Sequence, residues 1–201
     1  TINNENLYVA DTGNQTIRKI LISSSEVTTI AGSRGLRGST DDTGTSALFN
    51  DPRAVVTDGN NLYISDSSNN TIRKLQITTL EVTTLAGRAN EKGSTDDTGL
   101  SARFNYPTGI TKDTTNLYVT DYLSHTIRKI VVASGDVTTL AGTAGSSGSA
   151  DGTGSSARFS GPRGIATDGI NLYVVEAANH TVRKINIETG DVTTIAGLAG
   201  N

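Results

Sequence analysis

Acidic residues recur in the Gly- and Thr-rich segments of this chain and are the first candidates for chemistry. Three segments carry one cluster, which reads Asp41-Asp42-Thr43-Gly44, Asp96-Asp97-Thr98-Gly99 and Asp151-Gly152-Thr153-Gly154. Calcium takes about six to eight oxygens, usually from a loop of alternating acidic residues, and two adjacent carboxylates supply too few. We therefore expect Asx-type turns, in which side-chain oxygens accept backbone N–H groups, and no cofactor, with a calcium site as the alternative.

A second set of carboxylates precedes an arginine by seven residues. The pairs are Asp11 and Arg18, Asp66 and Arg73, Asp121 and Arg128, and Glu176 and Arg183. Where the two members face each other across a hairpin, charge-assisted hydrogen bonds between them fix the turn. A structural role is the prediction, and a functional ring of carboxylates is the alternative.

The two histidines, His125 and His180, occupy equivalent positions at which other copies carry Gln15 and Asn70. Zinc needs three or four converging ligands, and no further histidine is present to complete such a site. These positions are expected to be turn residues. Nucleophile-elbow, phosphate-loop and dinucleotide-binding patterns are absent from any strand-to-helix setting, so the chain is not expected to be an enzyme.

Composition narrows the class of protein. The 201 residues include 22 glycines, no cysteine and a formal net charge of -3, which disfavours nonspecific binding to nucleic acid and rules out disulfides. No apolar run reaches the roughly 18 residues that a membrane span needs. A cysteine-free chain rich in Ser, Thr, Asn and Gly is typical of exported bacterial proteins, so a secreted, periplasmic or cell-surface location is expected.

A repeat of 55 residues organises the whole chain. The string Val-Thr-Thr-Ile/Leu-Ala-Gly begins at Val27, Val82, Val137 and Val192. The string Asn-Leu-Tyr keeps the same spacing from Asn6, as does Thr-Ile/Val-Arg-Lys from Thr16. All three prolines and all three phenylalanines also share this register. A strict period of this size predicts an architecture of stacked, similar units.

Each copy contains four short apolar runs separated by turn signals, the pattern of a four-stranded antiparallel meander. In the second copy the expected strands are Ala54 to Thr57, Leu62 to Ser65, Thr71 to Leu75 and Val82 to Ala86, with a tight turn at Asp58-Gly59. Weak alternation of apolar and polar residues indicates sheets that are covered on both faces. A β-propeller is therefore predicted, with a β-sandwich as the alternative.

The aromatic residues that follow the acidic clusters are expected to anchor their loops. Phe49, Phe104 and Phe159 each close an Ala-Leu/Arg-Phe string directly after a cluster. Aromatic side chains bury large apolar areas, so each ring is predicted to lie between two blades.

The fourth copy strongly resembles an NHL repeat. The likeness runs from Asp151 to Phe159, through Gly161-Pro162-Arg163-Gly164-Ile165 and Asn171-Leu172-Tyr173-Val174, to the string from Asn179 to Lys184. The Asn-His-Leu triplet that names this family has its counterpart in Asn179-His180-Thr181. The resemblance recurs in every copy and implies a propeller, usually of about six blades, that serves mainly as a binding platform, with a few enzymatic relatives.

The copies divide residues 1–201 into blades at 1–32, 51–87, 106–142 and 161–201, joined by long loops. The first blade is expected to lack its first strand. Six such blades need roughly 330 residues, so we expect part of a larger ring that further blades or a second chain complete.

The connecting loops predict where a partner binds. They lie on one face of a propeller together with the second-to-third strand turns, and loops on a rigid scaffold commonly carry binding residues. The candidate residues on this loop-rich face are Asp41, Asp42, Arg88, Asp96, Asp97, His125, Asp151 and His180. The chain is expected to be a noncatalytic scaffold for a protein or carbohydrate; a structural segment of an extracellular assembly and a metal-dependent lyase or lactonase are the alternatives.

Overall fold

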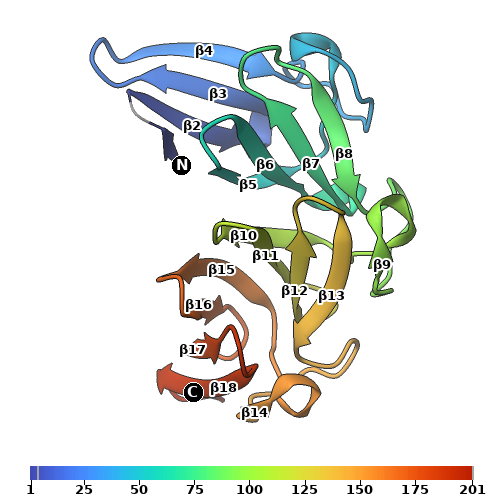
Figure 1. Ribbon diagram of the computed structural model, residues 1–201, viewed down its shortest axis with the longest axis vertical. Coiled ribbons are helices and arrows are strands. Elements are labelled where there is room, and N and C mark those ends of the chain that lie inside the picture. The colour runs from blue at the N-terminus through green and yellow to red at the C-terminus, as the bar shows by residue number, and fades with distance from the viewer. Residues whose placement is uncertain (4, 201) are drawn as a thin grey trace.

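The computed structural model describes residues 1–3 and 5–200 and shows an all-β chain (Figure 1). Its strands form four antiparallel sheets that follow one another along the chain. The first sheet contains β1 (Ile2–Asn3), β2 (Asn6–Asp11), β3 (Thr16–Leu21) and β4 (Glu26–Ala31), and the second contains β5 (Pro52–Thr57), β6 (Asn61–Asp66), β7 (Thr71–Gln76) and β8 (Val82–Ala86).

The third and fourth sheets repeat this meander and add a short outer strand. The third contains β10 (Pro107–Lys112), β11 (Asn116–Asp121), β12 (Thr126–Val131), β13 (Asp136–Ala141) and β9 (Asp97–Thr98). The fourth contains β15 (Pro162–Thr167), β16 (Asn171–Glu176), β17 (Thr181–Asn186), β18 (Asp191–Ala196) and β14 (Gly152–Thr153). These sheets confirm the predicted propeller blades.

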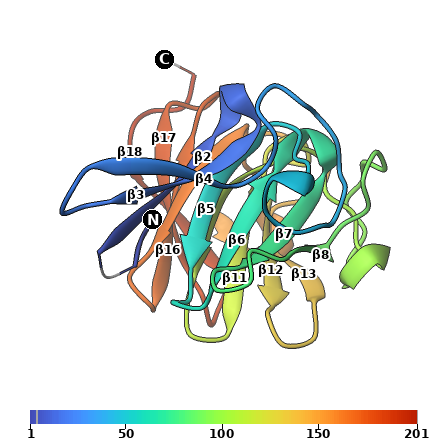
Figure 2. The ribbon, with the colours of Figure 1, turned by 90° about the horizontal axis from the view of Figure 1, so that it is seen from above.

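The blades are arranged in an open arc, in which the innermost strand β10 packs against both β5 and β15 (Figures 1 and 2). Gly109 of β10 lies close to β15, because a Cβ atom at this position would lie 2.3 Å from the carbonyl oxygen of Arg163. In the first blade only the two-residue β1 stands at the place of the innermost strand, so β2 packs directly against β5. The described residues form no closed ring.

The long loops do more than connect blades. The loop that leaves the second blade supplies β9, which pairs with β13 at the outer edge of the third blade, and β14 extends the fourth blade in the same way. Each of these loops also contains a short 3-10 turn: η2 (Gly44–Ser46), η4 (Gly99–Ser101) and η5 (Gly154–Ser156). Two further 3-10 turns, η1 (Thr12–Asn14) and η3 (Ser67–Asn69), join β2 to β3 and β6 to β7. The sequence pattern predicts only connections here, because strands of two residues contain no apolar run.

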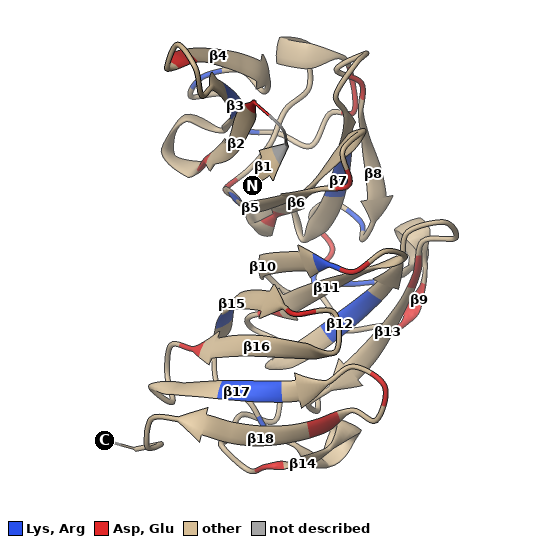
Figure 3. Ribbon diagram, turned by 60° about the vertical axis from the view of Figure 1, so that its left-hand side comes forward, with Lys and Arg blue, Asp and Glu red and all other residues tan. Residues whose placement is uncertain are grey.

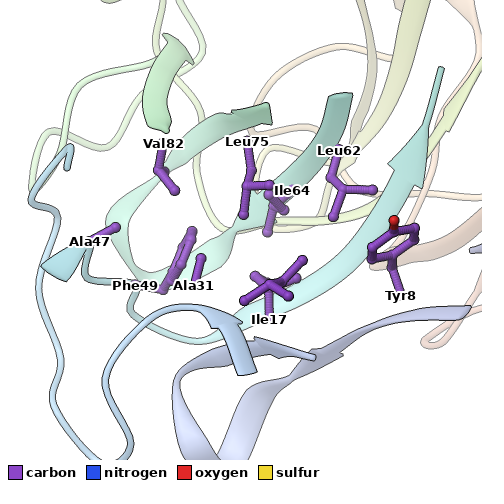
Figure 4. Packing of buried hydrophobic residues seen from close by; sticks show 10 residues of the cluster. Tyr8, Ile17, Ala31, Ala47, Phe49, Leu62, Ile64, Leu75 and Val82 are labelled. Carbon is purple, nitrogen blue, oxygen red and sulfur yellow. The ribbon is translucent and has the colours of Figure 1, made fainter. Parts of the chain in front are cut away.

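Apolar side chains fill the three spaces between successive blades. In the first space Tyr8 and Ile17 of the first blade face Leu62, Ile64 and Leu75 of the second, with Ala47 and Phe49 of the linking loop beside them (Figure 4). Burying a side chain of this size contributes about 1.5–3 kcal/mol. Interior blades are covered on both faces, which explains why β6 and β11 are buried along nearly their whole length.

The two outermost sheet faces of the arc are more exposed to solvent than the interior faces at equivalent positions of the repeat. Val27 is 48% exposed, whereas its counterpart Val82 is 1% exposed. At the other end Val175 is 48% exposed, whereas Thr120 is fully buried. The difference follows from packing, since no sheet of the described chain lies against these two faces. The described residues also contain no helix that is long and apolar enough to cross a membrane.

The Asn and Tyr residues of the recurring Asn-Leu-Tyr string bind an aspartate in the turn that precedes the string. The Asp58 carboxylate accepts hydrogen bonds from the Asn61 backbone at 2.7 Å and from the Tyr63 hydroxyl at 2.8 Å, and Asp113 is bound in the same way by Tyr118 at 2.7 Å. Partial burial would raise the pKa of Asp58, but these hydrogen bonds outweigh it and hold the pKa at about 2. Asp113 therefore makes this turn without the following glycine that the tight-turn pattern includes.

The Phe104 ring offers a test of how the loops hold the blades. Replacing this fully buried residue with alanine should lower the free energy of unfolding by about 3–5 kcal/mol, because the cavity cannot be refilled. Leu100→Ala, in the same loop but 55% exposed, is the matched control and should change it by less than about 0.5 kcal/mol. Urea denaturation measures the free energy of unfolding of both variants. Equal losses in the two would show that the loop is not anchored by its aromatic residue.

The Asp58 turn makes a prediction about acid stability. Its pKa is about 2 in the folded chain and ordinarily 3.8, so the stabilisation is complete above about pH 4 and is lost as the pH falls towards 2. The unfolding temperature of Asp58→Asn should therefore fall less steeply than that of the wild type as the pH is lowered from 5 to 2. Thermal unfolding of both proteins over this range measures the difference. Parallel curves for the two proteins would contradict the assignment.

Candidate functional site

The carboxylates of the acidic clusters are held by arginines of the following blade. Asp41 lies 2.6 Å from the Arg73 guanidinium, and Asp96 and Asp151 lie 2.6 Å and 2.8 Å from Arg128 and Arg183. The backbone N–H of Thr84 also donates to Asp41, at 3.0 Å. These three carboxylates connect one blade to the next, and this use competes with binding an outside ligand.

Each buried arginine is the centre of a set of contacts that we call the arginine hub. In the second blade Arg73 donates to Asp66 at 2.9 Å, to the Leu48 carbonyl at 2.9 Å and to the Thr40 carbonyl at 3.0 Å, besides Asp41. Its guanidinium lies 5.1 Å from the centre of the Phe49 ring. Arg128 and Arg183 repeat these contacts with Phe104 and Phe159, and Figure 3 shows the basic segments on β7, β12 and β17.

In the first blade no loop of the described chain reaches the hub arginine. Arg18 lies 3.5 Å from Asp11, and both side chains are 28% exposed, whereas Arg73 and Asp66 are fully buried. The expected carboxylate–arginine pairs are thus present in all four blades, including Glu176 with Arg183 at 2.9 Å. Only the three that receive a loop are sealed from solvent.

The remaining members of the acidic clusters serve their own turns. Asp42 accepts the backbone N–H of Thr43 at 2.6 Å, and Asp97 accepts that of Thr98 at 2.7 Å, although both residues are exposed. Arg88 forms an exposed ion pair with Glu91 at 3.4 Å. In the described part of the chain no group of three or more His, Asp or Glu side chains is placed to hold a metal ion.

The histidines occupy left-handed turn positions. His125 and His180 have φ values of 60° and 58°, and Gln15 and Asn70 have 63° and 59°. The Nδ1 atom of His125 accepts the backbone N–H of Gly161 at 3.2 Å. At the equivalent place Asn70 accepts the backbone N–H of Tyr106 at 2.9 Å. The side chain at this position therefore holds the start of the next innermost strand.

Five residues from three repeat positions meet on the loop-rich face; two of these positions carry a different residue in every copy, whereas Arg53 and Arg163 share the third. We call them the tyrosine–arginine cluster: Asp51, Arg53, Tyr106, Tyr122 and Arg163. They stand at the starts of β5, β10 and β15 and directly after β11, so they span three successive blades. The repeat pattern does not mark these residues as a site; the signal in the sequence that could have found them is the change from Asp51 to Tyr106 to Gly161 at one repeat position.

Cation–π and aromatic contacts link this cluster. The Arg53 guanidinium lies 5.2 Å from the centre of the Tyr106 ring, and that of Arg163 lies 5.3 Å from the centre of the Tyr122 ring. The two tyrosine rings are 6.2 Å apart and tilted by 59°. Such contacts between Arg and aromatic rings are attractive and hold the guanidinium groups in place.

Asp51 supplies the negative charge of the cluster. Its Oδ2 atom accepts hydrogen bonds from the Tyr106 hydroxyl and from Arg53, the latter at 3.0 Å. Partial burial would raise the pKa of Asp51, but these hydrogen bonds and the charge of Arg53 hold it below its ordinary value. Burial and the hydrogen bond to Asp51 raise the pKa of Tyr106. Asp51 is therefore an anionic acceptor, and Tyr106 is a neutral donor.

Small depressions also occur on the opposite face, where the strands meet the other turns. One of about 240 Å³ is lined by Asn61, Lys74, Gln76, Glu81 and Thr83. Another of about 300 Å³ lies between the first two blades. Small-molecule sites usually enclose about 300–1,000 Å³, so neither depression is large.

Comparison with known proteins identifies the family. No protein-family model matches the chain. NHL repeat-containing protein 2 of Bos taurus is 30% identical over 142 residues, which are 66% of this chain and 20% of that protein. The chain belongs to the NHL-repeat family. Protein SUPPRESSOR OF QUENCHING 1 of Arabidopsis thaliana, a chloroplastic protein, is 30% identical over 97% of this chain and 19% of its own length.

Solved structures share the fold of this NHL-repeat chain. A protein of unknown function from Bacteroides thetaiotaomicron superposes with a TM-score of 0.73 at 28% identity, over 90% of this chain and 44% of that one. An auxiliary nutrient binding protein of the same organism gives 0.68 at 20% identity, over 94% and 45%. Virginiamycin B lyase from Staphylococcus aureus gives 0.63 at 16% identity, over 97% and 53%. The chain spans about a fifth of its curated relatives and about half of these structures.

The arginine hub makes a prediction with an internal control. Arg73→Ala leaves the buried Asp66 carboxylate without its counter-charge and removes the donor to the Leu48 and Thr40 carbonyls, so it should lower the free energy of unfolding by about 3–5 kcal/mol. Arg18→Ala makes the same chemical change at the equivalent position of the first blade, where the pair is partly exposed, and should cost less than about 1 kcal/mol. Urea denaturation measures the free energy of unfolding of the two variants. Similar losses in both would refute the idea that the loop makes the arginine hub important for stability.

Proposed function

We propose that this NHL-repeat chain is a noncatalytic scaffold whose loop-rich face binds a protein or a carbohydrate. The tyrosine–arginine cluster carries the proposal, because Asp51, Tyr106 and Tyr122 depart from the repeat there and lie beside two exposed arginines. Tyr and Arg dominate the energetics of many interfaces. The auxiliary nutrient binding protein of the same fold agrees with a role in ligand binding, although at 20% identity that likeness establishes the fold alone.

The setting of the proposal follows from the same features. Further blades or a second chain would cover the exposed outermost faces, since apolar residues such as Val27 and Val175 are otherwise left to water. A secreted, periplasmic or cell-surface location suits a cysteine-free chain of this composition. Its net charge of -3 makes nucleic acid the less favoured partner.

Two other functions remain as alternatives to the scaffold. A structural segment of an extracellular assembly would account for the repetition, but it gives no reason for a cluster that departs from the repeat. A metal-dependent lyase or lactonase would resemble the fold neighbour from Staphylococcus aureus. The described inner strands β5, β10 and β15 contain no His, Asp or Glu that could hold the metal of such an enzyme.

The proposal predicts that binding depends on one face. Screening the chain against neutral and acidic oligosaccharides and extracellular proteins should find a ligand whose affinity falls at least roughly tenfold in Tyr122→Ala, the loss of a buried interface aromatic. Lys74→Ala, on the opposite face, should leave the affinity unchanged. A ligand lost with Lys74→Ala alone, or no ligand in the screen, would refute the scaffold. Stoichiometric bound calcium or zinc together with turnover of a lactone would favour the enzyme.

A further inference from the structure

Arg163 is a cation without an anionic partner. Its side chain is exposed and lies over the Tyr122 ring, and within the described residues no carboxylate comes within ion-pair distance. Arg73 and Arg128, in contrast, are fully buried and each bind two carboxylates. A guanidinium presents its N–H groups in a planar fork that matches a carboxylate. Because the aromatic ring already orients it, Arg163 is prepared to receive an anion.

Asp51 provides an acceptor of a different kind at the other end of the cluster. Its Oδ2 atom is used by Arg53 and Tyr106, whereas its Oδ1 atom takes part in no hydrogen bond among the described residues. An ionised carboxylate oxygen accepts hydrogen bonds only, so a ligand at this atom must bring a donor such as a hydroxyl group. The carboxylate also repels a ligand that carries negative charge along its whole length.

The surface between these two groups is aromatic. Tyr106 and Tyr122 are both partly exposed, and Leu123, which follows Tyr122, is 48% exposed. Arginine covers one side of each ring, so the remaining aromatic surface is formed by ring edges and tilted faces. Rings that are apolar in the body and polar at the tip suit a ligand with both C–H and hydroxyl surfaces.

We infer that the tyrosine–arginine cluster binds an oligosaccharide that contains a uronic acid. The sugar carboxylate pairs with Arg163, a sugar hydroxyl donates to Asp51, and the C–H surface of the ring packs against Tyr106 and Tyr122. This inference rests on the proposed function, since it names the ligand class of the loop-rich face. A single-stranded nucleic acid fits less well, because its phosphodiester backbone carries negative charge along its whole length, which the Asp51 carboxylate repels, and offers few hydroxyl groups to Asp51.

A pair of ligands that differ only in charge tests the inference. Glucuronosyl-xylotriose, an oligosaccharide with a single carboxylate, should bind the full chain at least roughly tenfold more tightly than its methyl ester, because the ester cannot form the charge-assisted hydrogen bonds to Arg163 and about 1.4 kcal/mol is a factor of ten. Arg163→Gln should remove this preference and leave the affinity for the ester unchanged. Isothermal titration calorimetry at low ionic strength measures both affinities.

Control variants distinguish a loss of binding at this site from the effect of a changed net charge and from the effect of unfolding. Lys74→Gln removes the same charge from the opposite face and should leave the preference for the acid intact. Tyr122→Ala should lower the affinity for the acid and for the ester by the same factor. Since Arg163 is exposed, Arg163→Gln should unfold at the wild-type temperature, and Arg163→Lys should retain part of the preference for the acid.

The outcomes distinguish this inference from the proposed function. Equal binding of acid and ester, or a preference for the acid that survives Arg163→Gln, would overturn the uronic-acid site. If the screen finds a neutral sugar or a protein on the loop-rich face, the scaffold stands and only the ligand class is wrong. Binding of oligouridylate that depends on Arg163, without binding of glucuronosyl-xylotriose, would also overturn the inference.

Discussion

The structure depends on a buried arginine that joins each blade to the loop from the blade before it. Arg73 binds the carboxylate at the end of its own hairpin, a second carboxylate from the loop and two loop carbonyls, and it lies over the Phe49 ring. A buried guanidinium is tolerated only when its N–H groups are paired, so the loop and the blade must fold together. Arg18 contacts no such loop among the described residues and is partly exposed.

This use of the loops has a consequence for function. Asp41, Asp96 and Asp151 looked like candidates for a binding surface, yet each is bound to a hub arginine. Asp42 and Asp97 stabilise their own turns. The repeated polar residues are thereby used in holding the blades together. Residues that are free to meet a ligand have to be found where the copies differ.

The innermost strands bring such residues together. Ser65 and Thr120 are polar but fully buried, because their hydroxyl groups donate to the carbonyls of Thr108 and Arg163 in the next innermost strand, at 2.6 Å and 2.7 Å. These bonds and the close approach at Gly109 hold β5, β10 and β15 side by side. Asp51, Tyr106 and Arg163 stand at the starts of these strands, so side chains from three blades form one continuous surface.

The 55-residue period, the four strands of each blade, the family and the pairing of Asp66 with Arg73 could all be predicted from the order of the residues. These features are local: a hairpin brings residues seven positions apart into contact, and the repeat shows the same pattern four times. The residue pattern did not reveal that Arg73 also binds Asp41, which lies in the preceding loop. Nor did it reveal that Tyr106 meets Tyr122, or that Arg163 of the next blade covers the Tyr122 ring. Such contacts are fixed in the folded chain alone, because they depend on how closely one blade packs against the next.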